Sequence, residues 1–235
     1  MTRDSSSAKE PGLSRRPEGS EGGGRSSAPA PSQALGAGSD EGRLIGRVTR
    51  CNIQGFAGGI RLTEPDLPTF GGLCRAPAQS GRSQVIGLIY DISIEDDDLA
   101  RQLAASDVPQ DEVRLDQQFV RPIPIEIRAL SVGYHDGESY IYDLPPQPPT
   151  TLADIHSLTS PEVRRFTESF DFLPLVLTAQ QLPTDSLLAA SFRQAALARP
   201  ESERRAFLVS AGRECARLLA RDLARLNNLV RSLQT

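Results

Sequence analysis

Hydrophobic and polar positions follow two different periods along this chain. Between residues 43 and 145, short runs alternate apolar and polar side chains, which is the period-two pattern of half-buried strands. Between residues 184 and 233, leucine and other apolar residues recur at steps of three and four, which is the pattern of amphipathic helices. The sequence therefore predicts a strand-rich part followed by a helical part.

The strand-rich part divides into short segments separated by turns that contain glycine and proline. The predicted strands cover residues 43–51, 59–62, 70–75, 84–94, 121–130 and 139–142. Residues 135–138 have the composition of a turn, so the last two strands should form a hairpin. Short strands with interior glycines are typical of a small barrel rather than of a doubly wound sheet. Residues 95–103, which begin with acidic side chains, resemble the start of a helix.

The segment after the strands should contain a short helix and a buried apolar stretch. Thr159 stands before Pro161 and Glu162 in the form of a capped helix start. Residues 170–177 are apolar enough to be buried, as either a strand or a helix.

The last part of the chain should be two helices. Thr184 or Asp185 should cap the first, and Pro200 should open the second. The second should run as one long amphipathic helix over residues 200–233. The fold class predicted is α+β, mainly a small β-barrel with appended C-terminal helices.

Composition sets the start of the chain apart. Hydrophobic residues make up 38% of the 235 residues, below the roughly 45–50% of an average globular protein. The deficit lies in residues 1–42, where only Met1, Leu13 and Leu35 are large and apolar. Such a segment buries too little apolar surface to offset its ordering entropy, so a disordered tail is expected. The predicted organisation is a tail (1–42), a barrel (43–145), a proline-rich exit with a short helix (146–183) and a helical segment (184–235).

Targeting signals and cysteine usage point to the cytoplasm. The first residues contain no apolar run like that of a signal peptide, and no stretch elsewhere is long and apolar enough to span a membrane. The three cysteines have no regular spacing, which suits a reducing compartment. We therefore expect a soluble, cytoplasmic protein.

The ionisable residues restrict the chemistry that is open to the chain. Lys9 is the only lysine among 26 basic residues, which excludes Schiff-base catalysis and a phosphate-binding Walker A lysine. The two histidines and three cysteines are not at metal-ligand spacing. His135 and Asp136 fall in the predicted turn, and the acidic run 96–98 is better explained as a helix start than as a cation site. We expect no catalysis, no cofactor and no metal.

Four arginines in the last segment are the strongest candidates for contact with a partner or with phosphate. Arg213, Arg217, Arg221 and Arg225 repeat every four residues and would form one ridge on a continuous helix. Guanidinium groups suit nucleic-acid phosphates. However, the chain has a net charge of −4 and only 5% aromatic residues, which favours a solvated or internally paired helix face. Direct nucleic-acid binding is the alternative hypothesis.

Several strand and turn motifs suggest a known family. Gly-Arg-Val opens the first predicted strand, Ile-Gly lies in a later one, and Gly-Tyr leads toward a Pro-Pro-x-Pro-Pro segment. The residues are Gly46, Arg47, Val48, Ile86, Gly87, Gly133, Tyr134, Pro145, Pro146, Pro148 and Pro149. Over about residues 43–177 the chain resembles the HAS-barrel, the small N-terminal β-barrel of HerA-type hexameric DNA translocases.

The resemblance implies the barrel without the motor. In HerA-type translocases a RecA-like ATPase with a Gly-Lys-Ser/Thr phosphate loop follows the barrel, and this chain has no such motif. In those proteins the barrel mediates subunit contacts and docks a partner nuclease. The function expected from the resemblance is therefore a non-catalytic adaptor or assembly module for a HerA-like ATPase or nuclease. Self-association through the apolar face of the predicted 200–233 helix is a second possible interaction.

Overall fold

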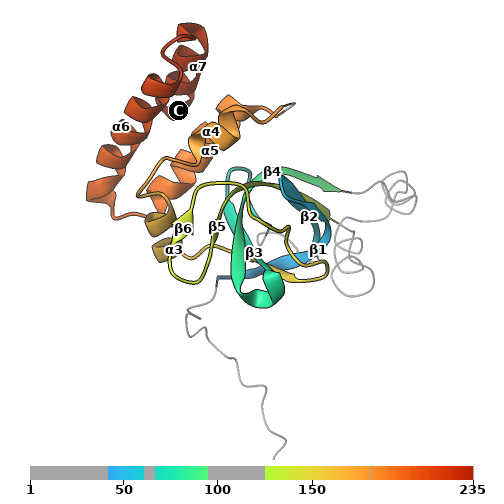
Figure 1. The fold of residues 1–235 in the computed structure, drawn as a ribbon. Coiled ribbons are helices and arrows are strands. Elements are labelled where there is room, and N and C mark those ends of the chain that lie inside the picture. Colours follow the sequence, from blue (N-terminus) through green and yellow to red (C-terminus); the bar gives the residue numbers. More distant parts are fainter. Residues whose placement is uncertain (1–41, 61–66, 95–124, 181, 235) are drawn as a thin grey trace, which may run out of the picture. The chain divides into compact units, whose positions relative to one another are not determined.

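Six antiparallel strands close into a barrel in the computed structural model, which describes residues 42–60, 67–94, 125–180 and 182–234 (Figure 1). The barrel strands are β1 (Leu44–Asn52), β2 (Gly55–Ile60), β3 (Leu73–Ala78), β4 (Ser83–Ile94), β5 (Ile125–His135) and β7 (Asp154–Ser157). Their order around the barrel is β1–β2–β5–β4–β3–β7, and β7 pairs with β1 to close it. Together with the C-terminal helices this confirms the α+β fold class. The predicted tail up to residue 41 and the predicted helix start at 95–103 lie outside the described residues, as do residues 61–62 and 121–124 of two predicted strands.

The hairpin predicted near residue 136 is confirmed. Strand β6 (Tyr140–Ile141) pairs with the end of β5, so that Tyr134 lies opposite Ile141. The Asp136 carboxylate accepts hydrogen bonds from the amides of Glu138 (2.9 Å) and Ser139 (2.9 Å), which holds the turn. These bonds favour the ionised carboxylate and lower the pKa of Asp136. A 3₁₀ turn, η1 (Gln79–Gly81), joins β3 to β4.

Strand β7 was not predicted from the sequence. It has four residues, and its one fully buried side chain is Ile155, so no alternating pattern is visible there. It lies beyond the proline-rich segment and runs between β1 and β3. The barrel therefore recruits its closing strand from a segment that the sequence analysis placed outside it.

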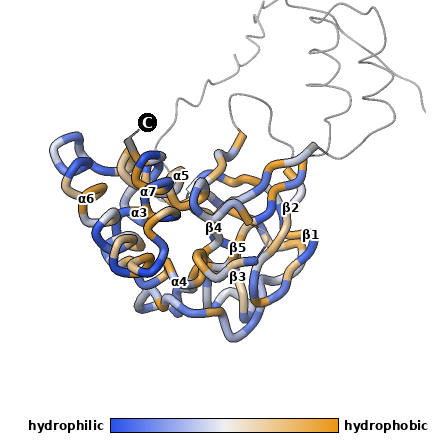
Figure 2. Tube along the Cα trace, turned by 90° about the horizontal axis from the view of Figure 1, so that it is seen from above, coloured by the Kyte–Doolittle hydropathy of each residue, from blue (hydrophilic) through white to orange (hydrophobic). Residues whose placement is uncertain are grey.

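The molecule has two hydrophobic cores, one inside the barrel and one outside it. The inner core includes Val48, Phe56, Ile89, Ile127 and Ile155, and it fills the barrel with side chains. The outer core joins outward-facing barrel residues to the helices. Its barrel members are Leu73, Ile86, Leu88, Val132 and Leu158. Figure 2 shows the hydrophobic and hydrophilic residues interleaved along the strands, as expected when successive side chains point to opposite faces.

Five described helices follow the barrel: α3 (Ser160–Phe166), α4 (Leu173–Leu177), α5 (Thr184–Leu197), α6 (Glu201–Leu218) and α7 (Leu223–Gln234). The cap predicted for α3 is confirmed, because Thr159 and Glu162 form a reciprocal capping box. The apolar stretch at 170–177 contains helix α4. Helix α5, in contrast, has no side-chain cap: Pro183 precedes it, and the Thr184 hydroxyl accepts a bond from Arg225 instead.

The prediction of one long helix over residues 200–233 is wrong, because the chain turns between α6 and α7. Asp222 provides a start for α7, since its carboxylate accepts a hydrogen bond from the Arg225 amide (3.0 Å) in the manner of an N-cap. The turn lets Leu229 reach the outer core and lets Arg225 form an ion pair with Asp185 on α5 (2.6 Å). Packing back onto α5 buries apolar surface that a straight helix would leave in water.

Candidate functional site: an arginine-lined groove on the barrel wall

A row of facing residues crosses four neighbouring strands on the outside of the barrel. Arg50 of β1 lies opposite Ala57 of β2, Ala57 lies opposite Arg128 of β5, and Arg128 lies opposite Asp91 of β4. Phe56, the neighbour of Ala57, belongs to the inner core. Because side chains alternate between the two faces of a strand, the row points outward.

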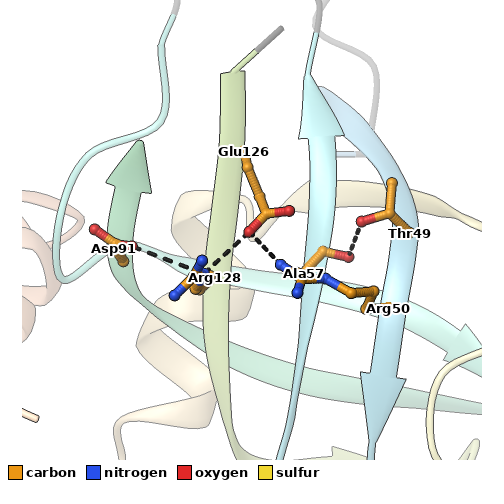
Figure 3. Close-up of polar contacts among 6 residues, drawn as sticks. All are labelled: Thr49, Arg50, Ala57, Asp91, Glu126 and Arg128. Carbon is orange, nitrogen blue, oxygen red and sulfur yellow. Dashed lines mark hydrogen bonds and ion pairs between the residues drawn. The ribbon is translucent and has the colours of Figure 1, made fainter. Parts of the chain in front are cut away.

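Glu126 connects the two arginines of this row. Its Oε1 atom accepts a hydrogen bond from Arg50 Nη2 (2.6 Å) and another from Arg128 Nε (3.0 Å), as Figure 3 shows. Asp91 lies 3.8 Å from Arg128 Nε at the end of the network. The Glu126 side chain is only 11% exposed, whereas those of Arg50 and Arg128 are 65% and 45% exposed. The carboxylate is therefore largely covered and the guanidiniums face solvent. We call Arg50, Glu126 and Arg128 the Arg–Glu–Arg bridge.

The bridge depends on the small residues of β2. Arg50 and Glu126 come from strands on either side of β2, so their backbones are separated by two strand spacings, about 10 Å. Gly59 lies opposite Glu126, and Ala57 lies opposite both arginines, so little side-chain bulk stands between the partners. A Cβ atom added to Gly59 would approach only the Thr49 methyl group, at 3.6 Å. Small residues on β2 thus leave a path for the long Arg50 side chain.

A β-bulge stands next to each end of the row. The register of β1 against β2 shifts between Val48 and Arg50, and the register of β4 against β5 shifts between Ile89 and Asp91. At the first shift, the Thr49 hydroxyl donates to the Ala57 carbonyl (3.3 Å). Bulges re-aim the side chains beside them and increase the local twist. Here they set the directions of Arg50 and Asp91.

The electrostatics of the bridge favour the charged form of Arg128. The hydrogen bond that Arg128 donates to Glu126, and then the negative charge of Glu126, raise the pKa of Arg128, and Asp91 adds a smaller contribution in the same direction. A guanidinium does not give up its proton at neutral pH. The bridge is therefore suited to binding anionic groups rather than to transferring protons.

The two arginines line an open groove of about 780 Å³. One side of the groove is the barrel wall, including Arg50, Ala57 and Arg128. The other side comes from α4 and the segment after it, including Leu175 and Gln180. The groove thus combines positive charge on one side with leucine and amide groups on the other.

The four arginines predicted to form a ridge do not do so. Arg213 and Arg217 lie on α6, Arg221 lies in the turn and Arg225 lies on α7, because the helix is interrupted. Arg217 donates a hydrogen bond to Glu214 (2.9 Å from Nε to Oε1), and Arg225 donates hydrogen bonds to Asp185 and Thr184. The arginines are therefore divided between two helices, and two of them are paired within the chain.

The apolar face predicted for self-association is covered in part by the chain itself. Phe207, Ala211 and Cys215 of α6 and Leu229 of α7 are buried in the outer core. Phe207, Ala211 and Cys215 belong to the apolar face predicted from the three- and four-residue spacing, whereas Leu229 does not. Leu223 and Val230 of the same face remain exposed, and Leu208, Leu218, Leu226 and Leu233 are partly buried, so self-association through this face stays a prediction.

The residues of the family-like motif lie in structural positions around the barrel. Arg47 forms an ion pair with Asp154 of β7 (2.9 Å), and Val48 belongs to the inner core. A Cβ atom at Gly46 would lie 2.3 Å from the Gly59 carbonyl oxygen, and one at Gly87 would lie 2.6 Å from the Phe56 ring. Only glycine fits these close approaches.

The remaining motif residues follow the same pattern. Ile86 is buried in the outer core, and a Cβ atom at Gly133 would lie 2.7 Å from the Ile141 carbonyl oxygen. Tyr134 is half-buried on β5. Pro145 and Pro149 are buried, whereas Pro146 and Pro148 are exposed. These residues build the barrel and its exit and do not converge on the groove.

Sequence reasoning missed the Arg–Glu–Arg bridge. One signal was present: Glu126 and Arg128 are two residues apart in a predicted strand, and therefore share a face. Arg50 could not be added to them, because its approach depends on the order β1–β2–β5. That order is a property of the closed barrel and leaves no local trace in the sequence.

The chain matches none of the models of known protein families, and a comparison with curated proteins found no match. Within the described ranges, the structure contains no helix with the length and apolar character needed to cross a membrane.

Proposed function

We propose that this chain is a non-catalytic adaptor, an assembly module that holds a partner protein on the outer wall of a HAS-like barrel. The observation that carries the proposal is the Arg–Glu–Arg bridge beside an open groove. Side chains fill the barrel interior, and the chain's own helices cover another part of the wall. The bridged wall, in contrast, holds charged groups in place and leaves them accessible beside the groove.

The chemistry of the bridge supports binding rather than catalysis. Its cations are guanidiniums, and its carboxylate is held between them. A fixed guanidinium contributes positive charge and directional hydrogen bonds, and these interactions allow it to bind an anionic group of a partner.

The resemblance to the HAS-barrel supports a partner of one particular kind. A HerA-like ATPase or a nuclease in a DNA-processing assembly is the partner that it implies. A cytoplasmic location suits this role, and the three free cysteines support it. Burial raises the pKa of Cys215 to about 12, and burial also raises the pKa of Cys74. Both thiols therefore stay protonated and unreactive in the folded chain.

The test is affinity purification of the full-length chain from its native host, with and without chemical crosslinking, followed by mass spectrometry. We expect a HerA-like ATPase or a nuclease to co-purify with the wild type and to be lost from the Arg50→Ala/Arg128→Ala double variant. Arg47→Ala is the matched control, because Arg47 is also an ion-paired arginine of β1 but does not line the groove.

One set of results would replace the adaptor by the nucleic-acid hypothesis. The chain would be monomeric, would recover no partner and would bind duplex DNA with an affinity that falls steeply with salt. That affinity would also decrease when Arg213, Arg217, Arg221 and Arg225 become alanine. The division of these arginines between two helices makes this outcome the less expected one.

A further inference from the structure

We infer that the groove binds an extended segment of the partner in which acidic residues alternate with apolar ones. This inference rests on the proposed adaptor function and specifies the chemistry of its ligand. It follows from three features of the groove: the exposed arginines, their separation across the wall, and the leucines on the opposite side.

The charge exposed to a ligand is positive. Glu126 is largely covered, and both arginines bond to the same oxygen of its carboxylate. To the described residues, Arg50 donates through Nη2 and Arg128 through Nε. Within the described residues, the remaining N–H groups of both guanidiniums form no further hydrogen bonds, so they can donate to a ligand. Carboxylates form strong, charge-assisted hydrogen bonds with such donors.

The separation of the arginines fits an extended peptide. Their backbones are two strand spacings apart, about 10 Å, and their guanidiniums converge on Glu126. In an extended peptide, residues i and i+2 point to the same face and are about 7 Å apart. Two acidic residues at these positions can each reach one arginine. The residue between them then points to the other side of the groove.

The other side of the groove is suited to an apolar residue. Leu175 and Leu182 lie there, and Leu144 is a further apolar residue of the lining. An extended peptide with an acidic–apolar–acidic core thus places its carboxylates on the barrel wall and its apolar side chain against the leucines. Other proteins that bind extended peptides also recognise alternate side chains of the peptide in separate pockets.

Single-stranded nucleic acid fits the same groove less well. Proteins that bind single-stranded nucleic acid use aromatic side chains on which the bases stack. The residues that line the groove include two aromatic ones, Tyr90 and Phe56. Phe56 belongs to the inner core and is buried.

Fluorescence anisotropy with short labelled peptides tests the inference on the full-length chain. The probe has a Glu-Leu-Glu-Leu-Glu core between glycine and serine residues. One control peptide carries the same residues in block order, Glu-Glu-Glu-Leu-Leu, and another replaces glutamate by lysine. We expect saturable binding of the alternating peptide, weaker binding of the block peptide and none of the lysine peptide. Binding should weaken as salt is added.

Variants separate the groove from general electrostatic attraction. Arg50→Ala and Arg128→Ala should each weaken binding of the alternating peptide about tenfold, and Arg47→Ala should leave it unchanged. Gln180→Glu keeps the bridge intact but adds a negative charge to the opposite side, so it should also weaken binding. Because Gln180 is exposed, this variant should fold normally, which circular dichroism and thermal melting would verify.

The outcomes distinguish this inference from the adaptor proposal. If the native-host partner is retained by Arg50→Ala/Arg128→Ala and the alternating peptide does not bind, the chain is an adaptor but the groove inference is wrong. Equal binding of alternating and block peptides would also contradict the inference. Preference for oligothymidylate over every peptide, together with recovery of no partner, would contradict both proposals.

Discussion

Two parts of the same barrel wall differ in what covers them. Where Leu73, Ile86 and Leu88 point outward, the chain's own helices pack on the wall and form the outer core. Where Arg50, Glu126 and Arg128 point outward, the wall borders an open groove. Strand β5 takes part in both, because its first outward residues, Glu126 and Arg128, are charged, whereas Leu130 and Val132 further along belong with the outer core. Outward side chains, rather than the barrel itself, thus decide which wall is closed within the chain and which remains accessible.

The covered wall should be the more sensitive to loss of packing, and Phe166→Ala is the strongest test. The Phe166 ring is fully buried and contacts Tyr140, Tyr142 and Phe172 at centroid distances of 5.2–5.3 Å. Truncation should reduce the free energy of unfolding by about 3–5 kcal/mol. Urea denaturation monitored by circular dichroism measures this change. Leu152→Ala is the control, because Leu152 is 70% exposed and should have almost no effect.

A smaller effect on the same wall is expected for Arg199→Ala. Arg199 joins three helices: it donates to the Ala195 carbonyl (2.8 Å) and the Thr167 hydroxyl (2.8 Å), and its guanidinium carbon lies 3.7 Å from the Phe207 ring centroid. Its removal leaves partly buried oxygen atoms without their donor, so the free energy of unfolding should decrease by about 2–3 kcal/mol.

Arg199→Lys tests whether geometry or charge matters at this position. Lysine keeps the charge but cannot reproduce the planar fork of guanidinium donors. Thermal denaturation should place it between the wild type and Arg199→Ala. A melting temperature equal to that of the wild type would contradict the proposed bonding role.

On the accessible wall, Glu126→Gln should affect stability less and binding more. The substitution retains the shape of the side chain but removes the charge that both arginines share, so the free energy of unfolding should decrease by about 1–2 kcal/mol. The guanidiniums lose their common anchor, and the alternating peptide should bind more weakly although both arginines remain. Tighter peptide binding than in the wild type would show that Glu126 competes with the ligand rather than positioning the arginines.

The smallest effect is expected at the β5–β6 turn, where the pH dependence can be given a sign. The amides of Ser139 and Glu138 lower the pKa of Asp136 below its unfolded value of about 3.9. Its contribution to stability is therefore present above about pH 4 and is lost as the pH falls through the lower folded pKa. Asp136→Asn should show a slightly flatter decline of stability in acid than the wild type. Glu138→Gln, which changes a neighbouring exposed carboxylate, should follow the wild-type decline.

Local patterns predicted much of the fold, and non-local arrangements explain what was missed. Thr159 with Glu162 and the residue 136 turn carry their signals within a few positions, and both are confirmed. The interruption before α7 is accompanied by the pairing of Arg225 with Asp185, which are 40 residues apart, so its consequences lie outside the local sequence. The helical period continues unbroken through the turn, so periodicity alone favoured one helix.

The site was harder to predict than the fold for the same reason. Glu126 and Arg128 could be placed on one face of a strand, but Arg50 approaches them only across β2. The arginines that were chosen instead shared a simple four-residue spacing. Spacing reports a shared face only while one helix continues, and α6 ends at Leu218.

The closing strand β7 also determines when the barrel can form during synthesis. Arg47 of β1 pairs with Asp154 of β7, 107 residues later in the chain. Until that segment leaves the ribosome, β1 and β3 each present an unpaired edge, and such edges pair readily with other chains. Closure across so long a separation is entropically costly and slow. A nascent chain that stops at residue 145 would hold five of the six barrel strands and still aggregate, because its sheet would have no strand to join the two edges.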